Sequence, residues 1–267
     1  MYLTIDIGGT KTEVMLFSNL GCLKQKFRFF TNADPNKFTS DLTNRLQLFL
    51  TEDYDIKVVA VAFPGIVENN RPLIAPNLPS WQNFDLVALL KGLFKCPIFF
   101  ANDADLATIY ETKGKPGRTI YLTFSTGLGG GIAENGRLTP ESSSFEPGHD
   151  LYVFNGQESE WEDIASASAI NAVYGGLITD PKEDYVFRDI ALRVSLGITR
   201  IIQTLHPDTI IIGGPLGAVF PSFGSYLEEI LRSTLGSHAK LPKIVKAKRP
   251  MDATSYGCRL FAQQNSR

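Results

Sequence analysis

Hydrophobic residues follow two different periods along the chain, and clusters of turn residues separate the segments that follow each period. Within 35–49 they recur at steps of four, four and three, so they lie on one face of a helix. Asp34-Pro35 supplies a typical N-cap and first helical position. The same period predicts helices over 84–94, 104–113, 162–174, 191–205, 222–235 and 252–264.

Short runs rich in β-branched and aromatic residues lie between these helices. The strands expected from them are Tyr2–Ile7, Glu13–Phe17, Lys26–Phe30, Lys57–Phe63, Pro97–Ala101, Thr119–Ser125, Gly130–Glu134 and Thr209–Ile212. Alternating strands and helices are typical of a layered α/β fold. The most irregular stretch is 137–160, and loops of that length are uncommon unless they bind a ligand.

One segment of the chain is repeated. YLTIDIGGTKTEV, from Tyr2, aligns without a gap on YLTFSTGLGGGIA, from Tyr121, and each copy is predicted to form a strand, a glycine turn and a second strand. The repeat favours two related lobes, although chance similarity between two hairpins is the alternative. The polar stretch 113–117 sets the expected domains at 1–113 and 114–267, and the C-terminal helix could also pack back on the first domain.

The composition is that of a globular protein without a charged or apolar targeting segment. A net charge of −2 gives no general attraction to nucleic acid or to anionic membranes. The first residues lack a signal-peptide pattern and no apolar run is long enough to span a membrane, so we expect a cytoplasmic protein. Cys22, Cys96 and Cys258 are too far apart in sequence for a CxxC metal site.

Two glycine-rich turns could bring backbone N–H groups close to phosphate oxygens. They are DIGGTK, residues 6–11, and TGLGGG, residues 126–131. Both lead into strands rather than helices, which disfavours Walker and dinucleotide-binding motifs. Tight turns alone also require glycine, so a single such turn would be weak evidence. A pair of them predicts a clamp for a nucleotide's phosphates.

Polar residues follow the predicted strand 97–101 at its carboxyl end, where ligands of α/β sheets gather. Asp103 could accept the proton of an attacking hydroxyl, and Asn102 could hold a neighbouring sugar hydroxyl. The alternative is a helix N-cap, a role that Asp105 fits better than Asp103. An ordinary aspartate suffices as base because in loose phosphoryl transfer it mainly orients the nucleophile.

Further candidate ligands are more ambiguous. Glu146 and His149 lie in the irregular segment and Glu162 begins the next predicted helix, so all three could bind sugar hydroxyls. Taken separately, Glu146 would be a solvated loop carboxylate and Glu162 a favourable charge at a helix N-terminus. Gly213-Gly214 after a buried strand could admit a base or ribose, or could form a tight strand-to-loop turn.

Taken together and in order, these motifs resemble those of the ROK family (repressor, open reading frame, kinase) from residue 4 to about residue 262. The matching segments are DIGGTK at 6–11, FPGIV at 63–67, NLPSW at 77–81, NDA at 102–104, STGLGGGI at 125–132, EPGH at 146–149 and IIIGG at 210–214. The resemblance implies the two-lobed, ribonuclease H-like α/β fold of the actin and hexokinase ATPases, with a cleft between the lobes.

The resemblance also implies an activity: ATP with Mg²⁺ donates its γ-phosphoryl group to the 6-hydroxyl of a hexose. Asp103 would be the base, and Asp6 would lie near the nucleotide's Mg²⁺, directly or through water. Sugar binding is implied for Gly65, Asn77, Asn102, Asp103, Glu146, His149 and Glu162. Nucleotide and phosphate contacts are implied for Asp6, Gly8, Gly9, Thr10, Lys11, Thr126, Gly127, Gly213 and Gly214.

The chain departs from the family pattern after the Gly-His pair. Most members have the zinc-binding cysteines CxCGxxGCxE there, whereas residues 155–162 contain no cysteine, so the sequence predicts no structural zinc. Glu162 still occupies the place of the motif's glutamate. We expect packing by Trp161 and Phe154 to replace the metal. Zinc-free members include polyphosphate-using glucokinases, which leaves the phosphoryl donor open.

The family resemblance leaves several functions open. Glucose is the leading acceptor, with N-acetylmannosamine, N-acetylglucosamine and fructose as alternatives. Family repressors have a helix-turn-helix domain before the first glycine motif, whereas five residues precede Asp6 here. A non-catalytic sugar-binding protein is the other rival, and the Asn102-Asp103 pair argues against it. Expected partners are a sugar, a nucleotide and a second copy of the chain in a homodimer.

Overall fold

The structure is a computed structural model that describes residues 1–51, 54–75, 77–176, 183–236 and 238–265. The chain divides into two compact units, of which the first contains Met1–Tyr110 and the C-terminal segment from Thr254, and the second contains Glu111–Ala253. The C-terminal helix belongs to the first unit because Cys258 and Ala262 pack in its core. A single division at residue 113 therefore does not describe the chain.

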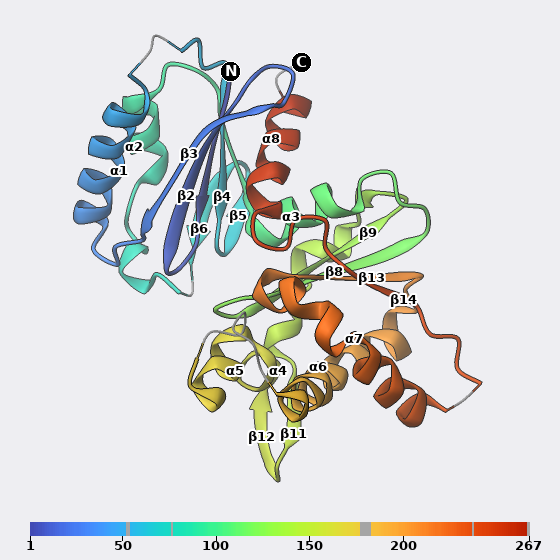
Figure 1. Cartoon of the computed structure of the whole chain (residues 1–267). Helices are drawn as coiled ribbons and strands as arrows, with labels where there is room; N and C mark the ends of the chain where they lie inside the picture. The colour runs from blue at the N-terminus through green and yellow to red at the C-terminus, as the bar shows by residue number, and fades with distance from the viewer. Residues whose placement is uncertain (52–53, 76, 177–182, 237, 266–267) are drawn as a thin grey trace. The chain divides into compact units, whose positions relative to one another are not determined.

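The first unit is a five-stranded sheet between two layers of helices (Figure 1). In sheet order its strands are β3 (Leu23–Phe30), β2 (Lys11–Phe17), β1 (Tyr2–Ile7), β4 (Val58–Phe63) and β7 (Ile98–Asn102). The helices are α1 (Pro35–Phe49) and α2 (Leu86–Leu93) on one face, and α3 (Asp103–Thr112) and α8 (Ala253–Asn265) on the other. Smaller elements are β5 (Ile66–Glu68), β6 (Arg71–Ile74) and the 3₁₀ turn η1 (Pro79–Trp81).

The second unit also has a five-stranded sheet. In sheet order its strands are β10 (Arg137–Leu138), β9 (Leu128–Glu134), β8 (Arg118–Phe124), β13 (Thr209–Gly213) and β14 (Lys243–Lys246). Its helices are α4 (Trp161–Ala165), α5 (Ala167–Tyr174), α6 (Asp184–Leu205) and α7 (Gly214–Leu235), which share one hydrophobic core with the sheet. The 3₁₀ turns η2 (Pro140–Ser144) and η3 (Pro147–His149) and the hairpin of β11 (Leu151–Phe154) and β12 (Gln157–Glu160) lie between β10 and α4.

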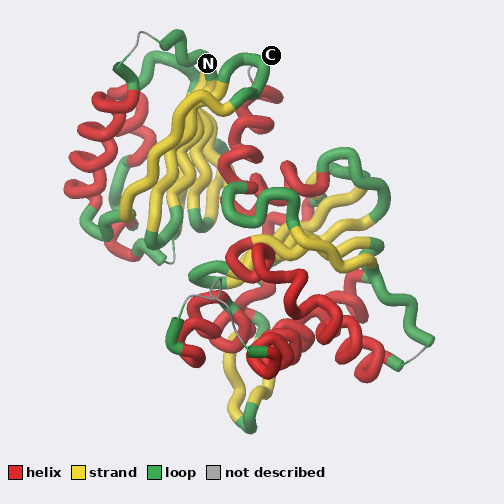
Figure 2. The backbone as a smooth tube through the Cα atoms, in the orientation of Figure 1, coloured by secondary structure: helices red, strands yellow, loops and turns green. Residues whose placement is uncertain are grey.

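The two sheets, whose strands are yellow in Figure 2, have the same connectivity. In the first, β1 is antiparallel to β2 and parallel to β4, and in the second, β8 is antiparallel to β9 and parallel to β13. The repeated segments at Tyr2 and Tyr121 therefore form the corresponding hairpin of each sheet. This agreement of topology favours related halves over chance similarity.

Several predicted segments differ from the structure, among them the helix predicted over 191–205, which begins at Asp184. Residues 151–160, expected to be irregular, form the β11–β12 hairpin. The helix predicted over 162–174 is interrupted at Ser166, whose extended backbone and side-chain oxygen cap α5. The helix predicted from residue 222 begins at Gly214, because burial of its hydrophobic face outweighs the interruption by Pro221. The glycines at 213–214 therefore lead into a helix and not into a loop.

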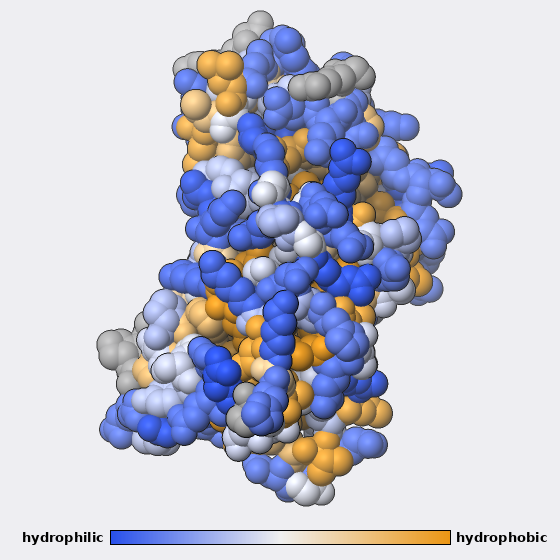
Figure 3. Space-filling view, turned by 90° about the vertical axis from the view of Figure 1, so that its right-hand side faces the viewer, coloured by the Kyte–Doolittle hydropathy of each residue, from blue (hydrophilic) through white to orange (hydrophobic). Residues whose placement is uncertain are grey.

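The surface is mixed. On the face drawn in Figure 3, hydrophilic residues surround separate groups of hydrophobic residues. Within the part of the chain that the structure describes, no helix combines the length and hydrophobicity that crossing a membrane requires.

The packing of α8 against α3 predicts an unequal response of two helical glycines to alanine. A Cβ at Gly257 would lie 1.9 Å from the backbone oxygen of Leu106, whereas a Cβ at Gly92 in α2 meets nothing within 4 Å. We expect Gly257→Ala to lower the free energy of unfolding by about 1–3 kcal/mol. The matched control Gly92→Ala should leave it unchanged or raise it by up to about 1 kcal/mol. Urea denaturation measures both, and equal effects would contradict this packing.

Candidate active site

The candidate site in the first unit lies at the carboxyl ends of three parallel strands. Asp6 on β1 pairs with Ala62 on β4, which pairs with Ala101 on β7, so the three residues are level across the sheet. Asn102 ends β7 one residue later, and Asp103 begins α3. The strand register therefore brings Asp6 and the Asn102-Asp103 pair to the same edge.

Asn102 makes hydrogen bonds at this edge through both the oxygen and the nitrogen of its side-chain amide. Its Oδ1 accepts hydrogen bonds from the backbone N–H groups of Ala104 at 2.9 Å and Asp105 at 3.1 Å, so Asn102 caps α3. The prediction that Asp105 fits the cap better is wrong, because Asp105 donates to the cap. The Nδ2 of Asn102 donates to the backbone oxygen of Gly65 at 3.1 Å. Asp103 accepts from Ala104 N–H through Oδ1 at 2.9 Å.

Gly65 must be glycine in this conformation. Its φ is +155°, and a Cβ there would lie 2.0 Å from the backbone oxygen of Ile74. The side chain of Asn102 therefore reaches a backbone oxygen that only a glycine turn presents. Gly65 thus affects the site through its hydrogen bond with Asn102, in addition to any direct contact with a ligand.

The first glycine turn joins β1 to β2. The N–H of Gly8 donates to the backbone oxygen of Lys11 at 2.9 Å, which closes the turn. Gly9 faces Asn77, because a Cβ built on Gly9 would be 3.0 Å from the Asn77 Cβ. Thr10 and the first residue of β2, Lys11, are exposed. This one unit thus contains residues from four predicted motifs. They are Gly8-Gly9, Gly65, Asn77 and the Asn102-Asp103 pair.

Asp6 has the strongest electrostatic perturbation at this edge. Burial, as the largest cause, and the negative charges of Asp103 and Glu13 together raise the pKa of its carboxyl group to about 8, while Arg28 acts in the opposite direction. Part of the Asp6 residue nevertheless remains accessible to solvent. Glu13 is paired with Asp6 across β1 and β2 and is 5% exposed. Arg28 Nε donates to Glu13 Oε1 at 3.0 Å.

The chemistry of these groups fits a magnesium ion. Carboxylate oxygens are preferred Mg²⁺ ligands, and a cation beside Asp6 and Asp103 would favour the ionised form of Asp6, which burial and the charge of Asp103 now oppose.

The second unit contains the other glycine turn. Thr126 is exposed at its tip, and the N–H of Ser125 donates to the backbone oxygen of Gly127 at 2.8 Å. A Cβ on Gly127 would lie 2.6 Å from Glu162 Oε2, and this oxygen accepts a hydrogen bond from Leu128 N–H at 3.2 Å. Glu162 lies in the first turn of α4, as predicted, but its carboxylate contacts the glycine turn.

Gly213 and Gly214 connect β13 to α7. A Cβ on Gly213 would lie 2.2 Å from the hydroxyl oxygen of Tyr121, and one on Gly214 would lie 2.2 Å from the backbone oxygen of Phe124. Gly214 also has a φ of +70°. Both positions therefore exclude side chains, which keeps the N-terminus of α7 close to the end of β8. Backbone N–H groups at such a terminus favour anionic ligands.

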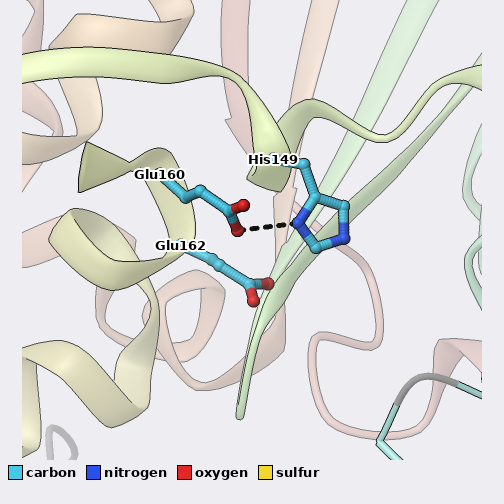
Figure 4. Close-up of side chains that lie close together, drawn as sticks. All are labelled: His149, Glu160 and Glu162. Carbon is cyan, nitrogen blue, oxygen red and sulfur yellow. Dashed lines mark hydrogen bonds and ion pairs between the residues drawn. The ribbon is translucent and has the colours of Figure 1, made fainter. Parts of the chain in front are cut away.

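The Glu146–His149 segment, the end of β12 and the start of α4 bring a histidine and two glutamates together (Figure 4). His149 Nδ1 lies 2.8 Å from Glu160 Oε2, and the nearest ligand atoms of His149, Glu160 and Glu162 lie within 4.8 Å of one another. The hydrogen bond with Glu160 raises the pKa of His149 most, and the charges of Glu162 and Glu146 act in the same direction. Glu146 itself is exposed.

Sequence analysis did not identify two of these residues. Glu13 was assigned only to a strand, although a glutamate among hydrophobic strand residues opposite an aspartate signals a polar partner. Glu160 was only part of the cysteine-free stretch. The available signal was Asn155-Gly156, a typical two-residue hairpin turn, which would have placed Glu160 opposite Leu151.

Comparisons with known proteins agree with the predicted resemblance. The model of the ROK family matches residues 2–265. A kanosamine kinase from Amycolatopsis mediterranei is 25% identical, with 96% of this chain and 91% of that protein covered. A xylose repressor from Bacillus spizizenii is 23% identical, with 88% and 73% covered.

Solved structures give the same result for the fold. A ROK family glucokinase from Streptomyces griseus, in complex with glucose and AMPPNP, superposes with a TM-score of 0.81 at 23% identity, covering 98% of this chain and 99% of that one. The predicted two-lobed actin-like ATPase fold is thereby confirmed. The chain belongs to the ROK family.

Proposed function

We propose that this protein is a sugar kinase that transfers the γ-phosphoryl group of ATP to the 6-hydroxyl of a hexose, with glucose as the leading acceptor. The main support is the edge where β1, β4 and β7 end. There a carboxylate at a helix start, Asp103, shares one unit with a glycine turn and with Asp6. Kinase chemistry requires a group that orients an alcohol and a site that holds phosphates.

Asp103 is proposed as the base. Its place as first residue of α3 is fixed by the Asn102 cap, so its carboxylate is held at the strand edge without a long flexible loop. The carboxylate would accept the proton of the attacking hydroxyl and align the hydroxyl oxygen with the phosphorus atom. Alignment is the larger part of its contribution, since an ordinary carboxylate is a weak base toward an alcohol.

The remaining sugar hydroxyls would be held by residues of both units. Asn77, Asn102 and the Gly65 turn belong to the first, and Glu146, His149 and Glu162 to the second. We propose that residues of both units contribute to sugar binding and that the bound sugar is shielded from water, which would otherwise compete as acceptor.

The two glycine turns are the proposed phosphate clamp. Gly8, Gly9, Thr10 and Lys11 would contact the phosphates from one unit and Thr126 and Gly127 from the other, with Gly213 and Gly214 beside the nucleoside. Asp6 would hold Mg²⁺, directly or through water. When bound, Mg²⁺ neutralises phosphate charge that develops during transfer. No structural zinc is part of this proposal.

One alternative is supported by a specific observation. Similarity to a xylose repressor shows that a related sequence serves in a regulator, so sugar binding without catalysis is the second candidate. The acceptor could also be N-acetylmannosamine, N-acetylglucosamine or fructose, and the donor polyphosphate. A coupled assay over these sugars with ATP and with polyphosphate distinguishes the candidates. Sugar binding without phosphorylation by either donor would favour the regulator.

Replacing the proposed base should separate catalysis from binding. We expect Asp103→Asn to lower kcat by about 100-fold or more, while the sugar dissociation constant measured by calorimetry changes little, because the amide keeps the shape but cannot accept the proton. Asp105→Asn, two residues further along α3, is the matched control and should keep kcat within a few-fold. Near-normal turnover of Asp103→Asn would refute the role of Asp103.

The raised pKa of Asp6 predicts a pH-dependent loss of stability without magnesium. Between its unfolded value of about 4 and its folded value of about 8, the folded chain binds the Asp6 proton more tightly, so this contribution to stability falls as pH rises. Asp6→Asn removes the titration. The variant should therefore gain stability relative to wild type from pH 5 to pH 8, by at least about 1 kcal/mol, since one pKa unit corresponds to about 1.4 kcal/mol.

Chemical denaturation in EDTA at both pH values measures this difference. Asp103→Asn is the companion variant: it removes a like charge near Asp6, lowers the pKa of Asp6 and should reduce the wild-type loss of stability at pH 8. A difference between Asp6→Asn and wild type that stays constant with pH would contradict the assignment.

A further inference from the structure

We propose that Glu160 is a positioning residue that holds the His149 ring in the Nδ1–H tautomer, so that Nε2 is left as an acceptor for a sugar hydroxyl without any metal ion. This inference rests on the proposed function, because it gives His149 its task in sugar binding. It concerns the hydrogen bond between Glu160 Oε2 and His149 Nδ1, at 2.8 Å.

The β11–β12 hairpin determines where Glu160 lies. The turn residues Asn155 and Gly156 have φ values of +51° and +78°, as a two-residue hairpin turn with positive φ at both positions requires. The resulting register pairs Phe154 with Gln157 and Leu151 with Glu160. Glu160 therefore lies opposite Leu151, the first residue of β11, which comes two residues after His149.

The paired strands β11 and β12 are followed directly by buried contacts at the start of α4. The backbone N–H of Trp161 donates to the oxygen of Asp150 at 2.9 Å, one residue after His149. The Trp161 side chain is 0% exposed, and its Nε1 donates to the backbone oxygen of Arg193 on α6 at 3.1 Å. A Cβ at Gly197 of α6 would lie 2.5 Å from the indole ring, so this glycine admits it. The residue between Glu160 and Glu162 is thus fixed in the core of the second unit.

The hydrogen bond determines which nitrogen carries the proton in the neutral imidazole ring. A carboxylate only accepts, so the ring nitrogen that faces it carries the proton, and in the neutral ring the other nitrogen then presents a lone pair. Figure 4 shows Nδ1 directed toward Glu160 and the second ring nitrogen directed away from it. With side chains 53% and 42% exposed, His149 and Glu160 are reachable by a solute.

The carboxylates around the ring have different partners. Glu162 Oε2 accepts from Leu128 N–H, while Glu160 bonds to the ring. Glu146 adds negative charge from the residue before η3. Because Glu162 has its own backbone partner, Glu160 is the carboxylate that selects the tautomer of His149. The same three ligand atoms lie within 4.8 Å, so a shared cation is the outcome that would contradict a metal-free role.

The decisive measurement is the tautomer of His149 in the intact chain. The chain has three histidines, so long-range ¹H–¹⁵N NMR spectra can be assigned by single substitutions of His206 and His238. In EDTA-treated wild type, at a pH at which the His149 ring is neutral, we expect the Nδ1–H tautomer. Glu160→Ala should shift His149 toward the Nε2–H form that unconstrained imidazole favours. Glu160→Gln, which keeps an acceptor oxygen, should give an intermediate result.

Kinetics supply the second readout, with the sugar that the wild-type chain phosphorylates fastest. Glu160→Ala should raise KM for that sugar by roughly 10-fold, as expected for a lost hydrogen bond to a charged group, with a smaller change in kcat. Glu158→Ala is the matched control, because Glu158 lies two residues earlier on β12, is exposed and pairs with Val153. It should leave KM and the tautomer unchanged.

Three results would overturn the inference. They are an unchanged tautomer in Glu160→Ala, equal effects of Glu158→Ala and Glu160→Ala on KM, and a stoichiometric metal in purified wild type that Glu160→Ala loses, measured by elemental analysis. If no sugar is phosphorylated, the proposed function fails, while the NMR result still decides whether Glu160 sets the state of His149. Thermal melting of each variant shows that it is folded.

Discussion

Burial of the Asp6 carboxyl group beside the negative charges of Asp103 and Glu13 is the constraint on which the site of the first unit depends. The strand register that forms the proposed phosphate-binding edge also brings these acids to it. Arg28 compensates Glu13, and burial leaves Asp6 with a raised pKa. Such an arrangement disfavours the ionised form of Asp6, and a cation at the proposed magnesium site would oppose this effect. The electrostatics of the site therefore favour binding of the proposed cation.

Close backbone approach is the second requirement, and it explains why glycines occur at both sheet edges. At Gly65, Gly213 and Gly214 a Cβ would lie 2.0–2.2 Å from an oxygen atom. These positions are required by the fold itself, whatever ligand is bound. Gly127 differs, since there a Cβ would meet the carboxylate of Glu162. Structural necessity and the proposed ligand contacts therefore concern the same turns, and variants at these glycines would report both.

The β11–β12 hairpin shows how a loop can be ordered by ordinary interactions. An Asn-Gly turn sets its register, Trp161 fixes its end in a hydrophobic core, and the Arg193 guanidinium lies over the Phe154 ring, 4.7 Å from its centroid. The expectation that Trp161 and Phe154 would hold this segment is consistent with these contacts. Side-chain packing orders this hairpin, and the Glu160 carboxylate lies beside His149.

By itself the sequence determined the elements whose signals are local. These include the helix over 35–49 with its cap, the strand before Gly8, the repeated hairpins and the order of motifs that identified the family, because hydrophobic period and turn chemistry act over a few residues. Only the tertiary structure decided that Asn102 caps α3, that α7 continues through Pro221, that α8 belongs to the first unit, and that Glu13 and Glu160 lie beside site residues. Each of these depends on packing or pairing between residues far apart in the chain or on competition between neighbouring caps, which no local pattern records.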